Sequence, residues 1–117
     1  MSFRFEKLVV WQEARFLVRE IYKITSKFPK EEQFGLTNQL RRAAVSILLN
    51  LAEGTNRASD KGKIRFFDMS HTSIDEVVTG FYIALDLGYM SKKEFDHIYE
   101  LLSKQAAKTV ALKKSLR

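Results

Sequence analysis

Cysteine is absent from the 117-residue sequence, and helix breakers are scarce, with one proline and five glycines. Without cysteine the chain forms neither a disulfide framework nor a thiolate metal site, so a reducing, cytoplasmic location is the default expectation. So few breakers favour long uninterrupted helices. The sequence also shows no alternating strand pattern, no internal repeat and no low-complexity tract. These absences predict an all-α fold.

Long apolar runs are also missing. The longest uncharged stretch near the middle of the chain, Ala43 to Ala52, is about half the length that spans a bilayer. The charged residues 1–7 lack the apolar segment of a secretory signal. We therefore expect no membrane-spanning segment and no membrane partner. With 45% hydrophobic and 29% charged residues, the composition predicts a single domain over residues 1–117.

Four helices are predicted from apolar residues that recur every three or four positions. The first ends before the single proline, and the second begins between Lys30 and Leu36 and stops at Gly54. Ser59 is a candidate N-cap for the third helix, which ends near Gly88, and Ser91-Lys92-Lys93-Glu94 is a capping box for the fourth. Short connections favour antiparallel neighbours, which predicts an up-down-up-down antiparallel four-helix bundle.

The predicted second helix is apolar around most of its circumference. Five of its polar side chains share one stripe, and apolar residues cover roughly 240° of the remainder. The stripe consists of Gln39, Arg42, Ser46, Asn50 and Glu53. Such a helix needs covering on several sides, which favours assembly with further copies of the chain. Apart from Arg42, we interpret the stripe as a buried hydrogen-bonding row that fixes helix register or subunit contacts, rather than Glu53 as an acid or base.

The net charge of +6 favours an anionic partner, of which nucleic acid is the most common. In the predicted topology the chain start, the loop after Gly54 and the end of the fourth helix share one end of the bundle. This basic end gathers most of the surplus cations, whereas the opposite end is slightly acidic. The cations of the basic end are Arg4, Lys7, Arg57, Lys61, Lys63, Arg65, Lys108, Lys113, Lys114 and Arg117.

Four of these cations surround the predicted N-terminus of the third helix, where the helix dipole disfavours cations. They are Arg57, Lys61, Lys63 and Arg65. Main-chain N–H groups among basic side chains suit a phosphate, although solvation is the alternative interpretation. We see no aromatic residues interleaved with these cations, which favours phosphate contact over base reading. Arg41 and Arg42 are further nucleic-acid candidates that could instead line a channel or pair across subunits.

Two acid-x-x-His pairs, Asp68 with His71 and Glu94 with His97, have the spacing of di-iron helical bundles. The predicted helices place the two histidines about 17 Å apart along the bundle axis, too far for one ion. No cysteine nucleophile, nucleophile elbow or triad context is present. We therefore expect a non-enzymatic protein with no metal or cofactor. Three aromatic residues are assigned to the core rather than to a ligand site, namely Trp11, Tyr22 and Phe28.

A series of short motifs from about Phe5 to beyond Leu102 resembles one known family. The motifs include Val10-Trp11-Gln12, Phe28-Pro29-Lys30-Glu31-Glu32, Gln39-Leu40-Arg41-Arg42-Ala43, Asn50-Leu51-Ala52-Glu53-Gly54 and Arg65-Phe66. The chain is similar to the 23S rRNA intervening-sequence proteins, also called the four-helix-bundle protein family. It is also similar to the accessory variability determinants of diversity-generating retroelements. The resemblance implies a bundle that assembles into a ring of five subunits around a central channel, with relatives that bind RNA and a reverse transcriptase.

Sequence and resemblance together lead to one hypothesis and one alternative. The hypothesis is a non-enzymatic cytoplasmic homopentamer that binds structured RNA, such as ribosomal RNA, through phosphate contacts at the basic end. The alternative is a protein-interaction scaffold ring that binds a partner protein such as a reverse transcriptase. In that case the positive charge serves only solubility.

Overall fold

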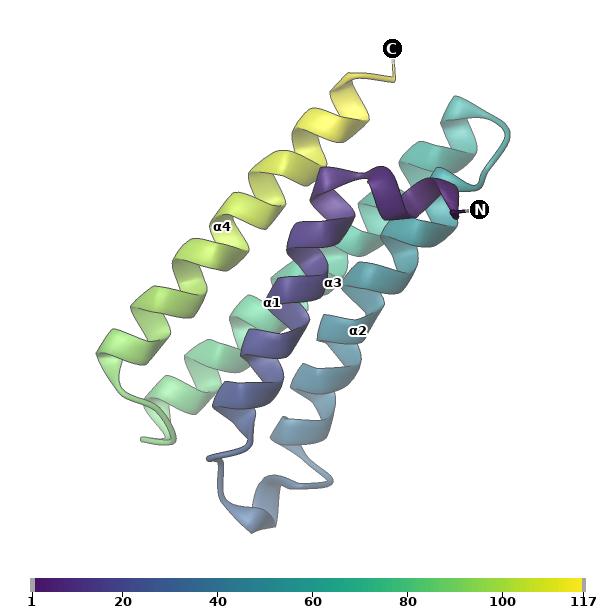
Figure 1. Cartoon of the computed structure of the whole chain (residues 1–117). Coiled ribbons are helices and arrows are strands. Elements are labelled where there is room, and N and C mark those ends of the chain that lie inside the picture. Colours follow the sequence, from purple (N-terminus) through teal and green to yellow (C-terminus); the bar gives the residue numbers. More distant parts are fainter. Residues whose placement is uncertain (1, 117) are drawn as a thin grey trace.

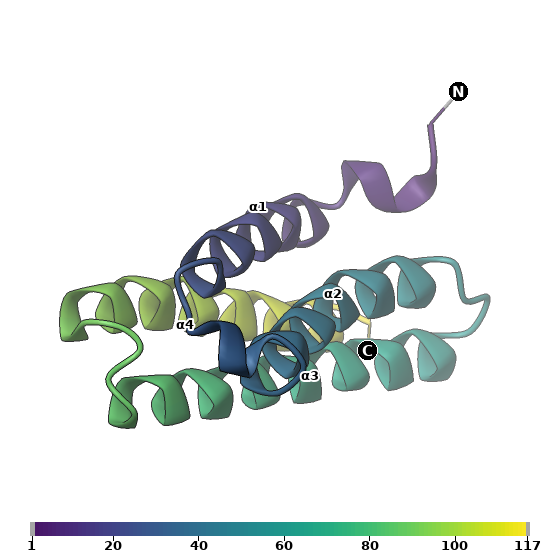
Figure 2. The same ribbon diagram turned by 90° about the horizontal axis from the view of Figure 1, so that it is seen from below.

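The computed structural model describes residues 2–116, and within that range it contains four α-helices, two short 3-10 helices and no strand. The α-helices are α1 (Val9–Thr25), α2 (Leu36–Thr55), α3 (Asp60–Asp86) and α4 (Lys92–Lys114). The 3-10 helices are η1 (Arg4–Lys7) and η2 (Lys30–Glu32). The α-helices run alternately up and down, and each of α1 and α3 packs against both α2 and α4 (Figures 1 and 2). The predicted all-α fold of four antiparallel helices is confirmed.

The helix ends follow local signals in the sequence. The Ser59 hydroxyl accepts a 3.0 Å hydrogen bond from the Gly62 N–H at the start of α3, as expected of an N-cap. Ser91 and Glu94 form the predicted capping box, with each side chain accepting from the other residue's N–H. Gly88, just after α3, has a φ of 76°, which glycine adopts without strain. The predicted boundaries are therefore right to within a few residues.

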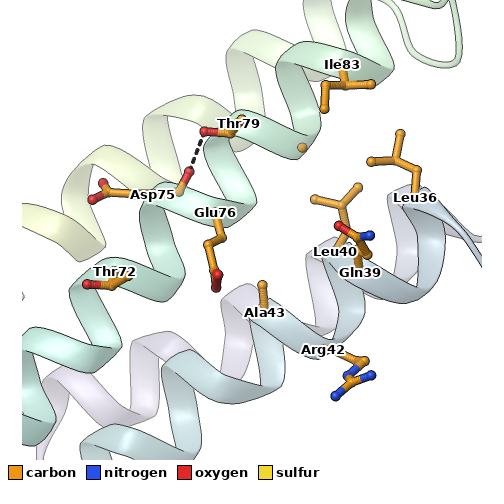
Figure 3. A pocket seen from close by; sticks show the side chains of 11 residues that line it. Leu36, Gln39, Leu40, Arg42, Ala43, Thr72, Asp75, Glu76, Thr79 and Ile83 are labelled. Atoms are coloured by element: carbon orange, nitrogen blue, oxygen red, sulfur yellow. Dashed lines mark hydrogen bonds between the residues drawn. The ribbon is translucent and has the colours of Figure 1, made fainter.

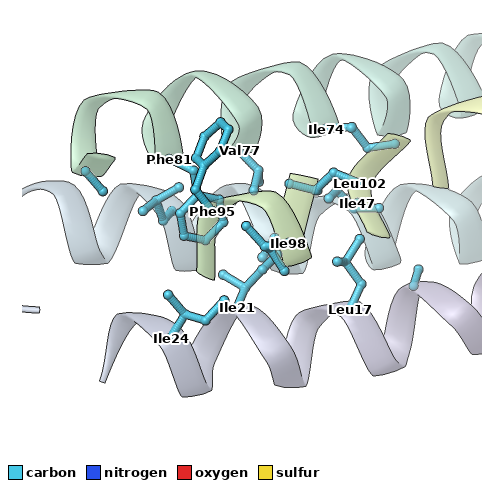
Figure 4. Packing of buried hydrophobic residues seen from close by; sticks show 14 of the residues in the cluster. Leu17, Ile21, Ile24, Ile47, Ile74, Val77, Phe81, Phe95, Ile98 and Leu102 are labelled. Carbon is cyan, nitrogen blue, oxygen red and sulfur yellow. The ribbon is translucent and has the colours of Figure 1, made fainter. Parts of the chain in front are cut away.

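A shared apolar core holds the four helices together (Figure 4). Each helix contributes side chains that are almost completely buried, such as Ile21 from α1, Ile47 from α2, Phe81 from α3 and Leu102 from α4. Burial of one such side chain stabilises the fold by about 1.5–3 kcal/mol. None of the described helices combines the length and the hydropathy that crossing a membrane requires.

The closest packing is between α2 and α3. A Cβ atom built on Gly80 of α3 would lie 2.5 Å from Leu40 Cδ2 of α2, so no larger residue fits without a shift. Ser70 of α3 is buried, and its hydroxyl donates a 2.8 Å hydrogen bond to the Ile47 carbonyl of α2. Small residues on α3 therefore bring its backbone close to α2 and fix how the two helices sit against each other.

Two of the three aromatic residues assigned to the core lie in it or against it. Phe28 is buried and Trp11 packs against the cluster, but Tyr22 is 40% exposed. The Arg41 guanidinium carbon lies 4.6 Å from the centroid of the Tyr22 ring. The core assignment of Tyr22 is wrong because its ring forms a cation–π contact at the surface, which helical periodicity does not reveal.

Candidate nucleic-acid interface

The basic end forms where the predicted topology puts it. The chain start with η1, the loop between α2 and α3 and the last turn of α4 all lie at the same end of the molecule (Figure 1). The connection between α1 and α2 and that between α3 and α4 lie at the opposite end. The structure thus brings cations from three segments of the chain to one end. Arg117, one of the predicted cations, is outside the described residues.

Two of the four cations around the start of α3 are free to meet a partner. Lys61 and Arg65 are both exposed, and neither forms an ion pair or a side-chain hydrogen bond within residues 2–116. They line a shallow depression on the first turns of α3, together with Ser59 and Gly62. The depression is open to solvent and carries a single carboxylate, that of Asp68. Its chemistry fits an anion better than a cation.

The other two cations of this group contact the protein itself. Arg57 forms an ion pair with Glu53, one helical turn earlier, and its guanidinium carbon lies 4.5 Å from the Phe66 ring centroid. The Lys63 ammonium donates a 3.0 Å hydrogen bond to the Thr55 carbonyl at the end of α2. A cation at a helix C-terminus is favoured by the partial negative charge of the last carbonyls. Arg57 and Lys63 therefore stabilise the loop between α2 and α3.

Further ion pairs reduce the surplus charge at the end of α4. The Lys108 ammonium pairs with Glu13 of α1, and the Lys113 ammonium lies 2.5 Å from an Asp68 carboxylate oxygen of α3. Both contacts join residues far apart in the sequence, so inspection of the sequence misses them. They tie the last turns of α4 to its two neighbours and leave a smaller set of unpaired cations at the basic end.

Arg41 and Arg42 lie apart from the loop cations. Arg41 donates a 2.9 Å hydrogen bond to the Thr25 hydroxyl and a 3.2 Å bond to the Tyr22 carbonyl, which closes the C-terminal end of α1. Arg42 is exposed on α2. Both precede the loop by four turns of α2, or about 20 Å of helix. The structure therefore does not unite them with Lys61 and Arg65 in one site.

A groove between α2 and α3 is lined by two residues of the predicted polar stripe, Gln39 and Arg42 (Figure 3). The Glu76 carboxylate of α3 points toward α2, whereas the Arg42 guanidinium points away from α3. Asp75 adds a second carboxylate to the lining. Two carboxylates beside one guanidinium leave no positive surplus, so this groove does not suit a phosphate.

The middle of the polar stripe links α2 to α3. The Ser73 hydroxyl of α3 donates a 2.9 Å hydrogen bond to the Ser46 hydroxyl, and the Asn50 amide donates to both the carbonyl and the hydroxyl of Ser46. The two ends of the stripe are not buried. Gln39 is exposed, and the Glu53 side chain is 51% exposed in its ion pair with Arg57. Within the single chain α3 covers only the central turns of this stripe, and the assignment of its two ends to subunit contacts stays a prediction.

The two histidines have separate partners. His71 Nδ1 lies 3.7 Å from the Asp75 carboxylate one turn later, and His97 Nε2 lies 3.5 Å from the Glu20 carboxylate of α1. Nowhere between residues 2 and 116 do three or more potential metal-ligating side chains gather. Neither acid-x-x-His pair is therefore part of a metal-binding cluster in this part of the chain.

Uncovered apolar surface remains on the outer side of α2. Leu49 is 63% exposed, and Val45 and Tyr22 lie beside it along a shallow depression. An exposed leucine in the middle of a long helix is not needed for the core of this chain. The excess of apolar residues on the second helix, noted in the sequence, is thus only partly absorbed by α1 and α3.

Four antiparallel helices with a cluster of cations at one end define a small, basic, all-helical protein. The model of one family, described as the 23S rRNA-intervening sequence protein, matches residues 6–111. The chain belongs to this family, and the match covers α1, α2 and α3 completely and nearly all of α4. A comparison with curated proteins finds none that matches the chain.

Proposed function

We propose that the protein is a non-enzymatic, oligomeric RNA-binding protein that contacts RNA phosphates through its basic end. The observation that carries this proposal is the pair Lys61 and Arg65, exposed on one side of α3 with no partner among the described residues. The family description associates the chain with ribosomal RNA, which makes structured RNA the expected ligand. Under this hypothesis the protein binds RNA and catalyses no reaction.

Intramolecular contacts distinguish three of the predicted phosphate-binding cations from Lys61 and Arg65. Arg57 and Lys63 hold the loop in place, and Arg41 closes the end of α1. Each already has a partner that a phosphate would have to displace. Lys61 and Arg65 gain most from a phosphate because they give up no intramolecular bond to bind it.

Assembly into a ring would strengthen such binding. Cyclic symmetry places equivalent ends of the subunits on one rim, so the modest surplus of each chain adds to a strongly positive surface. Exposed Leu49 on α2 supports assembly, because burying it in a subunit contact removes apolar surface from water. A homopentamer, the state implied by the family resemblance, is the expected form. Light scattering on the purified protein tests it, and a monomer at micromolar concentration contradicts it.

A salt series with two matched double variants tests RNA binding. Lys61→Gln with Arg65→Gln removes two charges from the basic end, and Lys30→Gln with Lys93→Gln removes two exposed charges from the opposite end. The slope of log K against log salt should fall by about 0.7 to 0.9 per lost phosphate contact in the first variant only. Equal slopes in both variants, or wild-type affinity that ignores salt, would exclude phosphate contact at this end.

The alternative is a scaffold that binds a partner protein, such as a reverse transcriptase, with no direct contact to RNA. The exposed apolar side of α2 is the observation that favours it. Copurification from cells with and without nuclease treatment separates the two functions. A partner retained after nuclease treatment, with no nucleic acid bound by the pure protein, supports the scaffold.

A further inference from the structure

A row of three aromatic rings leads from the core to the surface of the basic end. The rings of Phe3 and Phe5 are stacked, with centroids 5.8 Å apart and an angle of 14° between their planes. The Phe5 ring in turn contacts Trp11 of α1, with centroids 4.9 Å apart. Trp11 packs against the core, whereas Phe3 is 67% exposed. The outermost ring thus rests on one flat neighbour and has most of its surface in water.

Hydrogen bonds hold this row in position. The Phe3 N–H donates to the Glu6 carboxylate, and the Gln12 side chain of α1 donates a 2.8 Å bond to the Glu6 carbonyl. η1 itself packs against both α1 and the end of α2. The exposed ring is therefore presented by an anchored turn.

Cations flank the exposed ring. Arg4 and Lys7 line a shallow depression with Phe3 and Asn56, and Asn56 belongs to the loop that leads to Lys61. Neither Arg4 nor Lys7 forms an ion pair within residues 2–116. The sequence-based interpretation that no aromatic residue is interleaved with the cations concerned those around the start of α3, whereas in residues 3–7 Phe3 and Phe5 alternate with Arg4 and a second cation, Lys7. An exposed ring next to unpaired cations and a side-chain amide matches the chemistry of a nucleotide with a free base.

We infer that Phe3 is a stacking platform for an unpaired RNA base, with Arg4 and Lys7 contacting the phosphates on either side of that nucleotide. The inference rests on the proposed function and adds to it the kind of RNA that is bound. A base inside a duplex offers its faces only to its neighbours, so Phe3 selects loops, bulges or single strands. The Asn56 amide lies at the same depression and can donate to or accept from the edge of the base.

Three ligands of equal length test the inference with the full chain: a single-stranded RNA, the same strand in a duplex, and an abasic strand with the same phosphates. Phe3→Leu keeps an apolar side chain but removes the aromatic face, and Phe3→Tyr keeps both. Phe34→Leu is the matched control, since Phe34 is 88% exposed at the opposite end. Thermal unfolding followed by circular dichroism shows whether each variant is folded.

The wild type and Phe3→Tyr should bind the single strand about tenfold more tightly than the abasic strand, and Phe3→Leu should lose that difference. Phe34→Leu should bind like the wild type. If the three ligands bind equally, and Phe3→Leu changes nothing or changes only the oligomeric state, the stacking platform is wrong while salt-dependent phosphate contact stands. If no RNA binds at all, the proposed function fails, and the platform fails with it.

Discussion

The Tyr89 hydroxyl donates a 2.8 Å hydrogen bond to the Glu32 carboxylate, which joins the two connections at the end opposite the basic end. The other Glu32 oxygen accepts a 3.0 Å bond from the Leu36 N–H at the start of α2. One carboxylate therefore caps α2 and holds the turn after α3 against it. The Leu36 N–H, followed by the Tyr89 hydroxyl, lowers the pKa of Glu32, and the bond to Glu32 raises the pKa of Tyr89.

Replacing Tyr89 by phenylalanine should flatten the alkaline limb of the stability curve. Because the folded protein holds the Tyr89 proton more tightly than the unfolded chain, this bond stabilises fully below the tyrosine's ordinary pKa. Its contribution is lost as the pH rises through the higher folded pKa. Thermal unfolding between pH 8 and about 11 measures the effect. Tyr99→Phe, at an exposed position on α4, is the control, and an unchanged alkaline limb in Tyr89→Phe would contradict the prediction.

Glu94 should give the protein an acid-sensitive contact between the connection that follows α1 and the first turn of α4. The 2.6 Å hydrogen bond from the Lys27 ammonium, followed by the Ser91 N–H, lowers the pKa of Glu94 to about 2. A lowered folded pKa stabilises above the unfolded value of 4.5, and the contribution is lost as the pH falls from there to about 2.

Glu94→Gln should therefore lower the melting temperature at pH 7 and match the wild type near pH 2. Lys27→Gln removes the largest cause of the lowered Glu94 pKa. In this variant the stabilisation by Glu94 should therefore be lost at a higher pH than in the wild type. Melting curves across this range are the measurement. A constant difference between Glu94→Gln and the wild type at every pH would show that the effect is not electrostatic.

Replacing Gly80 by alanine should destabilise the protein, because the added methyl group would clash with the Leu40 side chain. The clash costs about 1–3 kcal/mol, and alanine's better helix propensity returns about 1 kcal/mol. Gly80→Ala should therefore reduce the free energy of unfolding, as measured by urea denaturation. In a Leu40→Ala background the clash disappears, so the same substitution should be neutral or stabilising. Additive effects of the two substitutions would refute the contact.

Arg41→Gln should lower the free energy of unfolding by about 1 kcal/mol, because the hydrogen bonds at the end of α1 and the contact with Tyr22 are lost. Arg42→Gln removes the same charge from an exposed position and should stay within about 0.5 kcal/mol of the wild type. Filter binding to RNA provides a second measurement. An RNA affinity that falls more for Arg41→Gln than for Lys61→Gln would restore Arg41 to the interface.

Local signals account for the part of the fold that the sequence predicts. Ser59, Ser91 and Gly88 act on helix ends within a few residues of themselves, so their roles are readable without the rest of the chain. Hydrophobic periodicity also indicates which residues of one helix share a face. These two kinds of information suffice for the number, length and antiparallel order of the helices.

The contacts that the sequence does not reveal join residues on different helices. Lys113 meets Asp68 and Arg41 meets Thr25 only after the helices have packed, and no spacing rule relates such pairs. The pair Glu53 and Arg57 does carry a signal in the sequence, the i to i+4 spacing of opposite charges on one helix face. The candidate site was therefore predicted as a region, while the structure separates its free cations from those with structural roles.

The close packing of Gly80 on Leu40 has a consequence for how the chain folds. α2 and α3 follow each other directly through residues 56–59, so their many contacts close only a short loop. Short loops form with little loss of chain entropy, and we expect this helical hairpin to be ordered in the folding transition state. Conservative truncations at Ile47 or Val77 should then slow folding more than truncations at Leu17 of α1, a ranking that φ-values from chevron plots measure.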